Sequence, residues 1–149
     1  MELLGKRLIP APIDATWTAL NDLDVLRSCI PGCESLAQVG PDRFEVVMAL
    51  KIGPIAARFR GHLAMTQVQA HVGYTIAFEG QGGVAGFGKG SADVTLVAED
   101  GGTWLSYVAR AQVGGKIAQV GSRLIDAAAG KIADTFFRRF ESSLQASVS

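Results

Sequence analysis

The stretch Lys116–Phe140, KIAQVGSRLIDAAAGKIADTFFRRF, decides the fold of this chain. At about 100° per residue, one broad helical face collects its large apolar residues and one alanine: Ile117, Val120, Leu124, Ala128, Ile132 and Phe136. The opposite face collects polar residues: Gln119, Arg123, Asp126, Asp134, Arg138 and Glu141. We therefore predict one amphipathic helix of roughly 25 residues, on the order of 38 Å long, which needs a partner to cover its apolar face.

The chain before this helix is predicted to be mostly β-strand. From Glu34 onward, apolar and polar residues alternate with a period of two, which is typical of strands with one buried face. Turn signals at Gly53–Pro54 and Asp100–Gly102 separate successive strands. The main residues assigned to the inner face are Phe44, Val46, Met48, Leu50, Ile52, Phe59, Leu63, Met65, Tyr74, Ile76, Phe78, Val94, Leu96, Leu105, Tyr107 and Val113.

The N-terminal part supplies the remaining elements. Met1–Pro10 is predicted to be a first strand, and Pro12 starts a short helix that runs to about Asn21. A second short helix, from about Leu23 to Ser28, ends at Pro31–Gly32. The order is one strand, two short helices, about six antiparallel strands and a long helix. It predicts a single α+β domain over residues 1–149, a helix-grip fold in which a strongly curved sheet wraps around the last helix.

The middle of the long helix carries small residues, Ala127 to Gly130. Opposite a concave sheet, small side chains either let the backbones approach closely or leave a void. We expect an apolar cavity at this position.

Bulk composition excludes several classes of function. Fourteen basic and fourteen acidic residues cancel, so net charge gives no sign of nucleic-acid binding. No run approaches the roughly 18 consecutive apolar residues of a membrane-spanning helix, and MELLGKRLIPAP lacks the apolar core of a signal peptide. We expect a cytoplasmic protein.

Metal and cofactor sites are not predicted. Cys29 and Cys33 are separated by three residues rather than the two of a redox motif, and no second Cys/His pair completes a metal site. His62 and His71 have no matching ligand set in the sequence. We expect reduced thiols packed beside a turn.

The glycine-rich segment Gly80–Gly90, GQGGVAGFGKG, partly matches two phosphate-binding patterns. Both patterns require a helix after the loop, so that its amide groups meet the phosphate. The residues that follow alternate as a strand, and Gly90 stands where a P-loop needs Ser or Thr. We therefore predict a flexible or bulged backbone, with Phe87 as an apolar lid or core plug.

The inner faces carry no candidate for acid–base catalysis. The inward positions include Tyr74 and Tyr107 but no carboxylate, histidine or lysine, so the sequence does not predict an enzyme. Buried tyrosine hydroxyls usually hydrogen-bond a partner. In an apolar pocket, they also suit a lipophilic molecule with a polar head.

Four segments resemble a known family. PIDATWTALNDLDVLRSCIPGCESL (residues 12–36) is similar to the opening of the START/Bet-v-like, polyketide-cyclase-related superfamily. KIGP (residues 51–54), GFGKGSADVTL (residues 86–96) and AQVGGKIAQVGSRLID (residues 111–126) narrow the resemblance to the CoxG-like family, which is named after a component of carbon monoxide dehydrogenase.

This resemblance implies a helix-grip protein without catalytic residues of its own. Members are typically encoded beside molybdenum hydroxylases of the carbon monoxide or xanthine dehydrogenase type. They are thought to help the enzyme meet the cytoplasmic membrane or to carry a lipophilic quinone to it. Many relatives continue into a variable tail with an apolar anchor, whereas this chain ends in the polar ESSLQASVS. We therefore expect transient membrane contact at most.

The leading hypothesis is a carrier that holds a quinone-like or acyl molecule between sheet and helix. The predicted ligand-binding residues are Met48, Phe59, Met65, Ile76, Phe78, Phe87, Val94, Val113, Leu124, Ala128 and Ile132. Phe87 and the Ile30–Gly32 turn are predicted at the mouth. The alternatives are a cyclase or hydrolase, which would need an ionisable group such as Asp22, His62 or Asp126 inside the pocket, and a protein–protein adaptor with a solid core.

Overall fold

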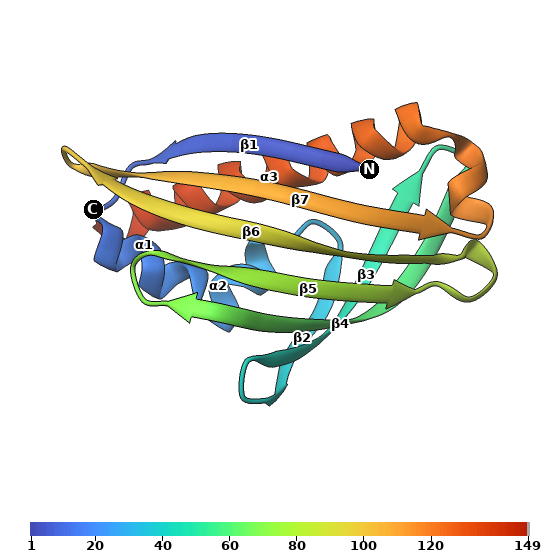
Figure 1. The fold of residues 1–149 in the computed structure, drawn as a ribbon, viewed down its shortest axis with the longest axis horizontal. Coiled ribbons are helices and arrows are strands. Elements are labelled where there is room, and N and C mark those ends of the chain that lie inside the picture. Colours follow the sequence, from blue (N-terminus) through green and yellow to red (C-terminus); the bar gives the residue numbers. More distant parts are fainter. Residues whose placement is uncertain (149) are drawn as a thin grey trace.

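The computed structural model describes residues 1–148 and has the predicted α+β helix-grip architecture (Figure 1). Its elements are β1 (Glu2–Ile9), α1 (Ile13–Leu20), α2 (Leu23–Cys29), β2 (Cys33–Gly40), β3 (Arg43–Ile52), β4 (Ile55–Gln69), β5 (Gly73–Gln81), the 3-10 helix η1 (Gly83–Ala85), β6 (Phe87–Glu99), β7 (Gly102–Gly114), the 3-10 helix η2 (Lys116–Val120) and α3 (Ser122–Val148). The strands form one antiparallel sheet in the order β1-β7-β6-β5-β4-β3-β2.

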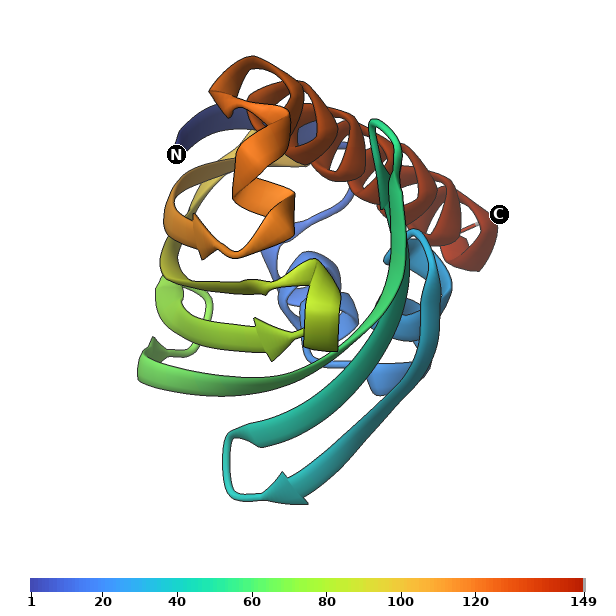
Figure 2. The ribbon, with the colours of Figure 1, turned by 90° about the vertical axis from the view of Figure 1, so that its right-hand side faces the viewer.

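The sheet bends into a deep trough, and α3 lies across its open side (Figure 2). The helix contacts β1 at one edge of the trough and β3 near the other. The short helices α1 and α2 fill the end of the trough where the C-terminal half of α3 lies, and α2 packs against α3 (Figure 1). The concave face of the sheet and α3 therefore enclose the interior of the molecule.

The predicted helix Lys116–Phe140 is wrong at both ends. Lys116–Val120 forms a 3-10 turn, and Gly121 then breaks the chain direction with φ +97° and ψ 152° before α3 begins at Ser122. At its other end α3 continues to Val148. The glycine after the 3-10 turn adopts a conformation that side-chain-bearing residues rarely take, which explains why the helix cannot run through this point.

The inward face of α3 is also rotated from the predicted one. Ile125, Ala129 and Ile132 recur at helical spacing and line the interior, whereas Leu124 is 45% exposed. Leu124 is about 100° around the helix from Ile125 and lies beside Gly53 of the β3–β4 turn. Its predicted place among the inward residues is wrong because the face centres on Ile125.

The solid core lies at the end of the trough that holds α1 and α2. Phe140 and Ile9 are fully buried there, and Leu105 is 1% exposed. Phe136 packs edge-on against Phe137 with a centroid distance of 5.1 Å and stacks on Phe140 at 5.8 Å. Aromatic side chains thus fill the space between sheet and helix at this end.

Ionic contacts hold α3 to the β1 edge. The Arg7 guanidinium lies 3.1 Å from Asp134 and 3.8 Å from Glu141, and it covers the Phe137 ring at 5.4 Å. Arg7 is mostly shielded, with 26% of its side chain exposed, whereas the Asp134 side chain is 52% exposed. Exposed ion pairs contribute little stability, so these contacts mainly fix where the helix sits along the edge strand.

Two glycines of the C-terminal segment test this description. A Cβ at either Gly121 or Gly130 would meet no atom within 4 Å, but only Gly121 has a positive φ. Gly130→Ala is expected to stabilise the protein by about 0.5–1 kcal/mol because alanine favours helix. Gly121→Ala is expected to destabilise it by about 1–3 kcal/mol through backbone strain. Urea unfolding of both variants checks this, and equal effects would contradict the break at Gly121.

Candidate functional site

The largest apolar space lies between the middle of the sheet and the N-terminal half of α3. This pocket, here called the Ala128 pocket, has a volume of about 340 Å³. Helix α3 contributes small or branched side chains to it: Ile125, Ala128, Ala129 and Ile132. The strands and η2 contribute Val46, Met48, Leu50, Ile52, Phe59, Gly61, Leu63, Phe78, Gly80, Phe87, Gly88, Ala111, Val113 and Ile117, and Met1, Glu79 and Lys89 complete its wall.

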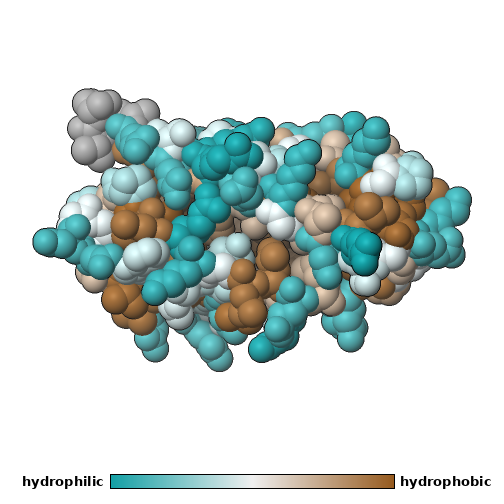
Figure 3. All heavy atoms as spheres, turned by 90° about the horizontal axis from the view of Figure 1, so that it is seen from above, coloured by the Kyte–Doolittle hydropathy of each residue, from teal (hydrophilic) through white to brown (hydrophobic). Residues whose placement is uncertain are grey.

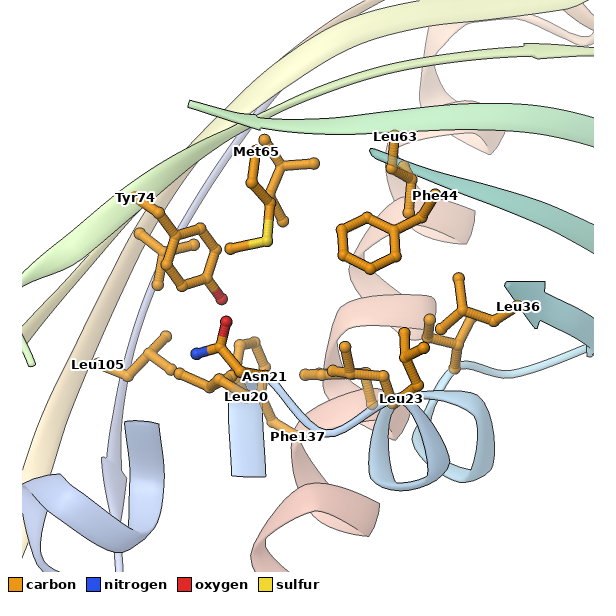
Figure 4. A pocket seen from close by; sticks show the side chains of 15 residues that line it. Leu20, Asn21, Leu23, Leu36, Phe44, Leu63, Met65, Tyr74, Leu105 and Phe137 are labelled. Atoms are coloured by element: carbon orange, nitrogen blue, oxygen red, sulfur yellow. The ribbon is translucent and has the colours of Figure 1, made fainter. Parts of the chain in front are cut away.

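A second apolar space lies deeper, beside α1 and α2 (Figure 4). This Tyr74 pocket has a volume of about 200 Å³. Its lining is Leu20, Asn21, Leu23, Leu26, Ile30, Leu36, Phe44, Leu63, Met65, Tyr74, Ile76, Val94, Leu105, Phe136 and Phe137. Leu63 of β4 lines both pockets. The two spaces therefore adjoin at one flexible aliphatic side chain.

The predicted ligand-binding residues divide between these pockets. The Ala128 pocket contains Met48, Phe59, Phe78, Phe87, Val113, Ala128 and Ile132. The Tyr74 pocket contains Met65, Ile76 and Val94, together with Ile30 from the predicted mouth. Leu124 lines neither pocket. The structure thus gathers all but one of the predicted residues around apolar space; that they bind a ligand stays a prediction.

Sequence reasoning missed the contribution of the short helices and β2. Leu20 of α1 and Leu23 and Leu26 of α2 line the Tyr74 pocket, and Leu36 comes from β2. Their helical spacing was visible, but not the placement of α1 and α2 across the end of the trough. That placement comes from tertiary packing rather than from local pattern.

The glycine-rich segment forms part of the rim of the Ala128 pocket. Residues Gly83–Ala85 make a single 3-10 turn, and strand β6 begins at Phe87. The prediction that a strand follows this loop is confirmed, and no helix N-terminus is available for phosphate. The Phe87 ring lies against Gly114, where a Cβ would come within 2.5 Å of it. Phe87 is 45% exposed, so it borders the pocket from outside rather than plugging the core.

Hydrophobic residues reach the surface at this end of the molecule. Figure 3 shows brown residues gathered at the end that carries η2 and the start of α3, and mostly hydrophilic residues over the middle of the same face. Val84, Phe87 and Leu124 are apolar side chains exposed near this end. No helix in the described part of the chain is both long and apolar enough to cross a bilayer.

Tyr74 places a hydroxyl group in the deeper pocket. Its side chain is 7% exposed, and Trp17 packs edge-on against its ring at 5.8 Å. Burial raises the pKa of Tyr74 well above its ordinary value, so the hydroxyl stays protonated and can donate a hydrogen bond at neutral pH. The second inward tyrosine, Tyr107, stacks on Phe137 at 5.3 Å and lines neither pocket.

The ionisable groups that an enzyme would need lie elsewhere. The Asp22 carboxylate accepts hydrogen bonds from the amides of Asp24 and Val25 at the start of α2. His62 lies on the outer face, 4.0 Å from Glu45, and Asp126 is exposed on α3. None of the three lines either pocket.

The charged groups in the wall of the Ala128 pocket face outward. Glu79 and Lys89 are exposed and pair across β5 and β6, where strand alternation directs them away from Phe78 and Gly88. The terminal amine of Met1 donates to the Ala111 carbonyl at 2.9 Å. Among residues 1–148, no group of three or more His, Cys, Asp or Glu side chains could hold a metal ion.

The burial of Tyr74 predicts a pH dependence of stability. Because its pKa is raised above the ordinary 10.0 in the folded state, the unfolded chain loses this proton first as the pH rises. The stabilising effect is complete below about pH 10 and is lost above it, at up to about 1.4 kcal/mol per pH unit. The free energy of unfolding, measured in urea from pH 8 to 11, should fall less steeply in Tyr74→Phe than in the wild type. Equal slopes would contradict the burial.

Several solved structures share the fold over nearly the whole chain. A conserved protein from Geobacillus kaustophilus has a TM-score of 0.93 at 26% identity, covering 99% of this chain and 97% of that one. A START superfamily protein from Mycobacterium smegmatis has a TM-score of 0.74 at 12% identity, with 97% of each chain covered.

The same fold occurs in the Zhui aromatase/cyclase from Streptomyces sp. R1128, with a TM-score of 0.69 at 12% identity over 100% of this chain and 96% of that one. No curated protein sequence is significantly similar to this chain. The family model of CoxG, a carbon monoxide dehydrogenase component, matches residues 5–145. The chain belongs to the CoxG family.

Proposed function

We propose that this protein is a non-catalytic accessory protein that carries a lipophilic molecule, quinone-like or acyl, for a molybdenum hydroxylase at the cytoplasmic membrane. The observation that carries the proposal is the pair of adjoining apolar pockets under α3. Their inner walls hold aliphatic and aromatic side chains with one buried hydroxyl group. Such a space matches a ligand that is mostly hydrocarbon with a small polar part.

The size of the space supports a ligand larger than a solvent molecule. The Ala128 pocket alone, at about 340 Å³, falls in the range of about 300–1,000 Å³ that is typical of small-molecule sites. Each square ångström of apolar surface that a ligand buries there contributes roughly 25 cal/mol. A hydrocarbon chain therefore gains affinity along its whole length without needing a specific polar contact.

The chemistry of the walls supports carriage rather than catalysis. Acid–base catalysis needs a titratable group within reach of the reacting atoms. The candidate groups Asp22, His62 and Asp126 lie outside both pockets. The Tyr74 hydroxyl is held in its protonated form by burial, which suits it to bind an oxygen atom rather than to exchange protons.

Membership of the CoxG family supports the proposed partner. The family is described as a component of carbon monoxide dehydrogenase, and a hydroxylase of that type is the partner we propose. The alternative of a cyclase rests on the aromatase/cyclase from Streptomyces, whose 12% identity indicates a shared fold alone. The alternative of an adaptor with a solid core does not account for the two pockets.

The first test fills the larger pocket with an indole ring. Ala128→Trp places the ring in the Ala128 pocket, so it should abolish binding of a decyl-substituted 1,4-benzoquinone measured by calorimetry. It should cost less than about 1 kcal/mol of stability, because open space accepts the ring, whereas overpacking of a filled core costs about 1–3 kcal/mol. The matched control is Ala127→Trp, since Ala127 is the exposed neighbour on the same helix and lines neither pocket.

Two outcomes would contradict the carrier proposal. One is wild-type protein that binds neither the quinone nor a fatty acid. The other is quinone binding that Ala128→Trp leaves unchanged, which would place the ligand outside the pocket.

The partner is tested separately from the ligand. Affinity-tagged wild-type protein and Ala128→Trp should both retain the molybdenum hydroxylase encoded beside this chain, because the substitution is internal. Only the wild type should support transfer of electrons from that enzyme to a membrane quinone. Full transfer with Ala128→Trp would favour the adaptor, and no retention of the enzyme by either protein would sink the proposed partner.

A further inference from the structure

We propose that the Tyr74 pocket is the subsite for the polar head of the ligand, whose hydrocarbon chain runs past Leu63 into the Ala128 pocket. The head contributes an uncharged oxygen, a ring carbonyl or hydroxyl group, which hydrogen-bonds to Tyr74 Oη. This inference rests on the proposed carrier function and adds to it the orientation of the ligand and the residue that recognises its head.

The Tyr74 hydroxyl has an unused hydrogen-bonding capacity. Over residues 1–148, Tyr74 Oη has no hydrogen-bond partner. Every fully enclosed side-chain nitrogen or oxygen in that part of the chain does have one, so Tyr74 Oη must open onto the pocket. A buried hydroxyl without a partner is costly, and a ligand oxygen at this point would satisfy it.

Asn21 places a second polar atom across from this hydroxyl. Its Nδ2 donates to the Trp17 carbonyl at 2.9 Å, which fixes the amide plane at the end of α1. The remaining oxygen, Oδ1, points toward the Tyr74 hydroxyl (Figure 4). The pocket therefore presents one donor and one acceptor, which accommodate a carbonyl oxygen or a hydroxyl group equally well.

The distribution of charge decides which head fits. None of the residues that line the Tyr74 pocket is Lys, Arg or His. A carboxylate buried there would lose its hydration without gaining a cation. A neutral oxygen meets a hydroxyl and an amide instead, so the pocket favours a quinone-like ring over the ionised head of a fatty acid.

The remaining space defines the direction of the chain. The Ala128 pocket has no hydroxyl or amide side chain in its wall, and its outward-facing charges lie on the far side of β5 and β6. Leu63 is shared by the two pockets, so a chain attached to a head at Tyr74 continues past this side chain toward Phe87 at the rim.

The test removes single oxygen atoms. A decyl-substituted 1,4-benzoquinone and decylbenzene, which lacks both carbonyls, are titrated by calorimetry into wild type, Tyr74→Phe and Tyr107→Phe. Tyr74→Phe should bind the quinone about five- to tenfold more weakly, the loss expected for one hydrogen bond, with decylbenzene affinity unchanged. Tyr107→Phe is the matched control, because its hydroxyl lies outside both pockets.

A second readout locates the head directly. Trp17 lies 5.8 Å from the Tyr74 ring, so a quinone ring held at Tyr74 should quench Trp17 fluorescence by contact. The Trp104→Phe variant leaves Trp17 as the single tryptophan. Strong quenching by the quinone is expected in this variant, and little in Trp17→Phe, whose remaining Trp104 lies beside Lys6.

The outcomes separate the two proposals. If the wild type binds the quinone but Tyr74→Phe binds it equally well, or loses quinone and decylbenzene alike, the head subsite is wrong and the carrier function stands. If Trp17 is not quenched, the head lies elsewhere. If the wild type binds no quinone at all, the carrier function itself fails, and this inference with it.

Discussion

A single contact arrangement determines both the stability of this protein and its hollow interior: α3 must cover the open side of a sheet that does not close on itself. Where the helix carries Phe136, Phe137 and Phe140, large rings fill the distance to the sheet and make a solid core. Where it carries Ala128 and Ala129, the same distance is left open. Because protein interiors are otherwise close-packed, a change of side-chain size along one helix suffices to create a binding space.

The short helices extend this arrangement by fixing one wall of the deeper pocket. Thr103 Oγ1 of β7 donates to the Ala11 carbonyl at 2.9 Å, and Thr16 Oγ1 of α1 donates to the Pro12 carbonyl at 3.0 Å. Both threonines are fully buried. These bonds tie the start of α1 to the sheet, and the end of the same helix carries Asn21 opposite Tyr74. The geometry of the polar subsite thus depends on a buried polar cluster at the other end of α1.

Local pattern was sufficient to predict the architecture, because each strand alternates with a period of two and the turns carry glycine, proline or aspartate. It also predicted most pocket residues, since inward positions of a concave sheet necessarily face the covering helix. It failed at Gly121, where periodicity continues through a backbone break, and hence at Leu124. It also could not divide the interior into two pockets, because that division depends on how α1, α2 and β2 pack across the end of the trough.

The central claim is that the space under α3 holds a lipophilic molecule in the cell. Native mass spectrometry of the protein purified without detergent, followed by organic extraction of the bound material, tests this most directly. The account predicts an additional mass on a fraction of the protein that extraction releases as a neutral, oxygen-containing lipid. Protein that emerges unliganded, and stays so after incubation with a quinone, would contradict it.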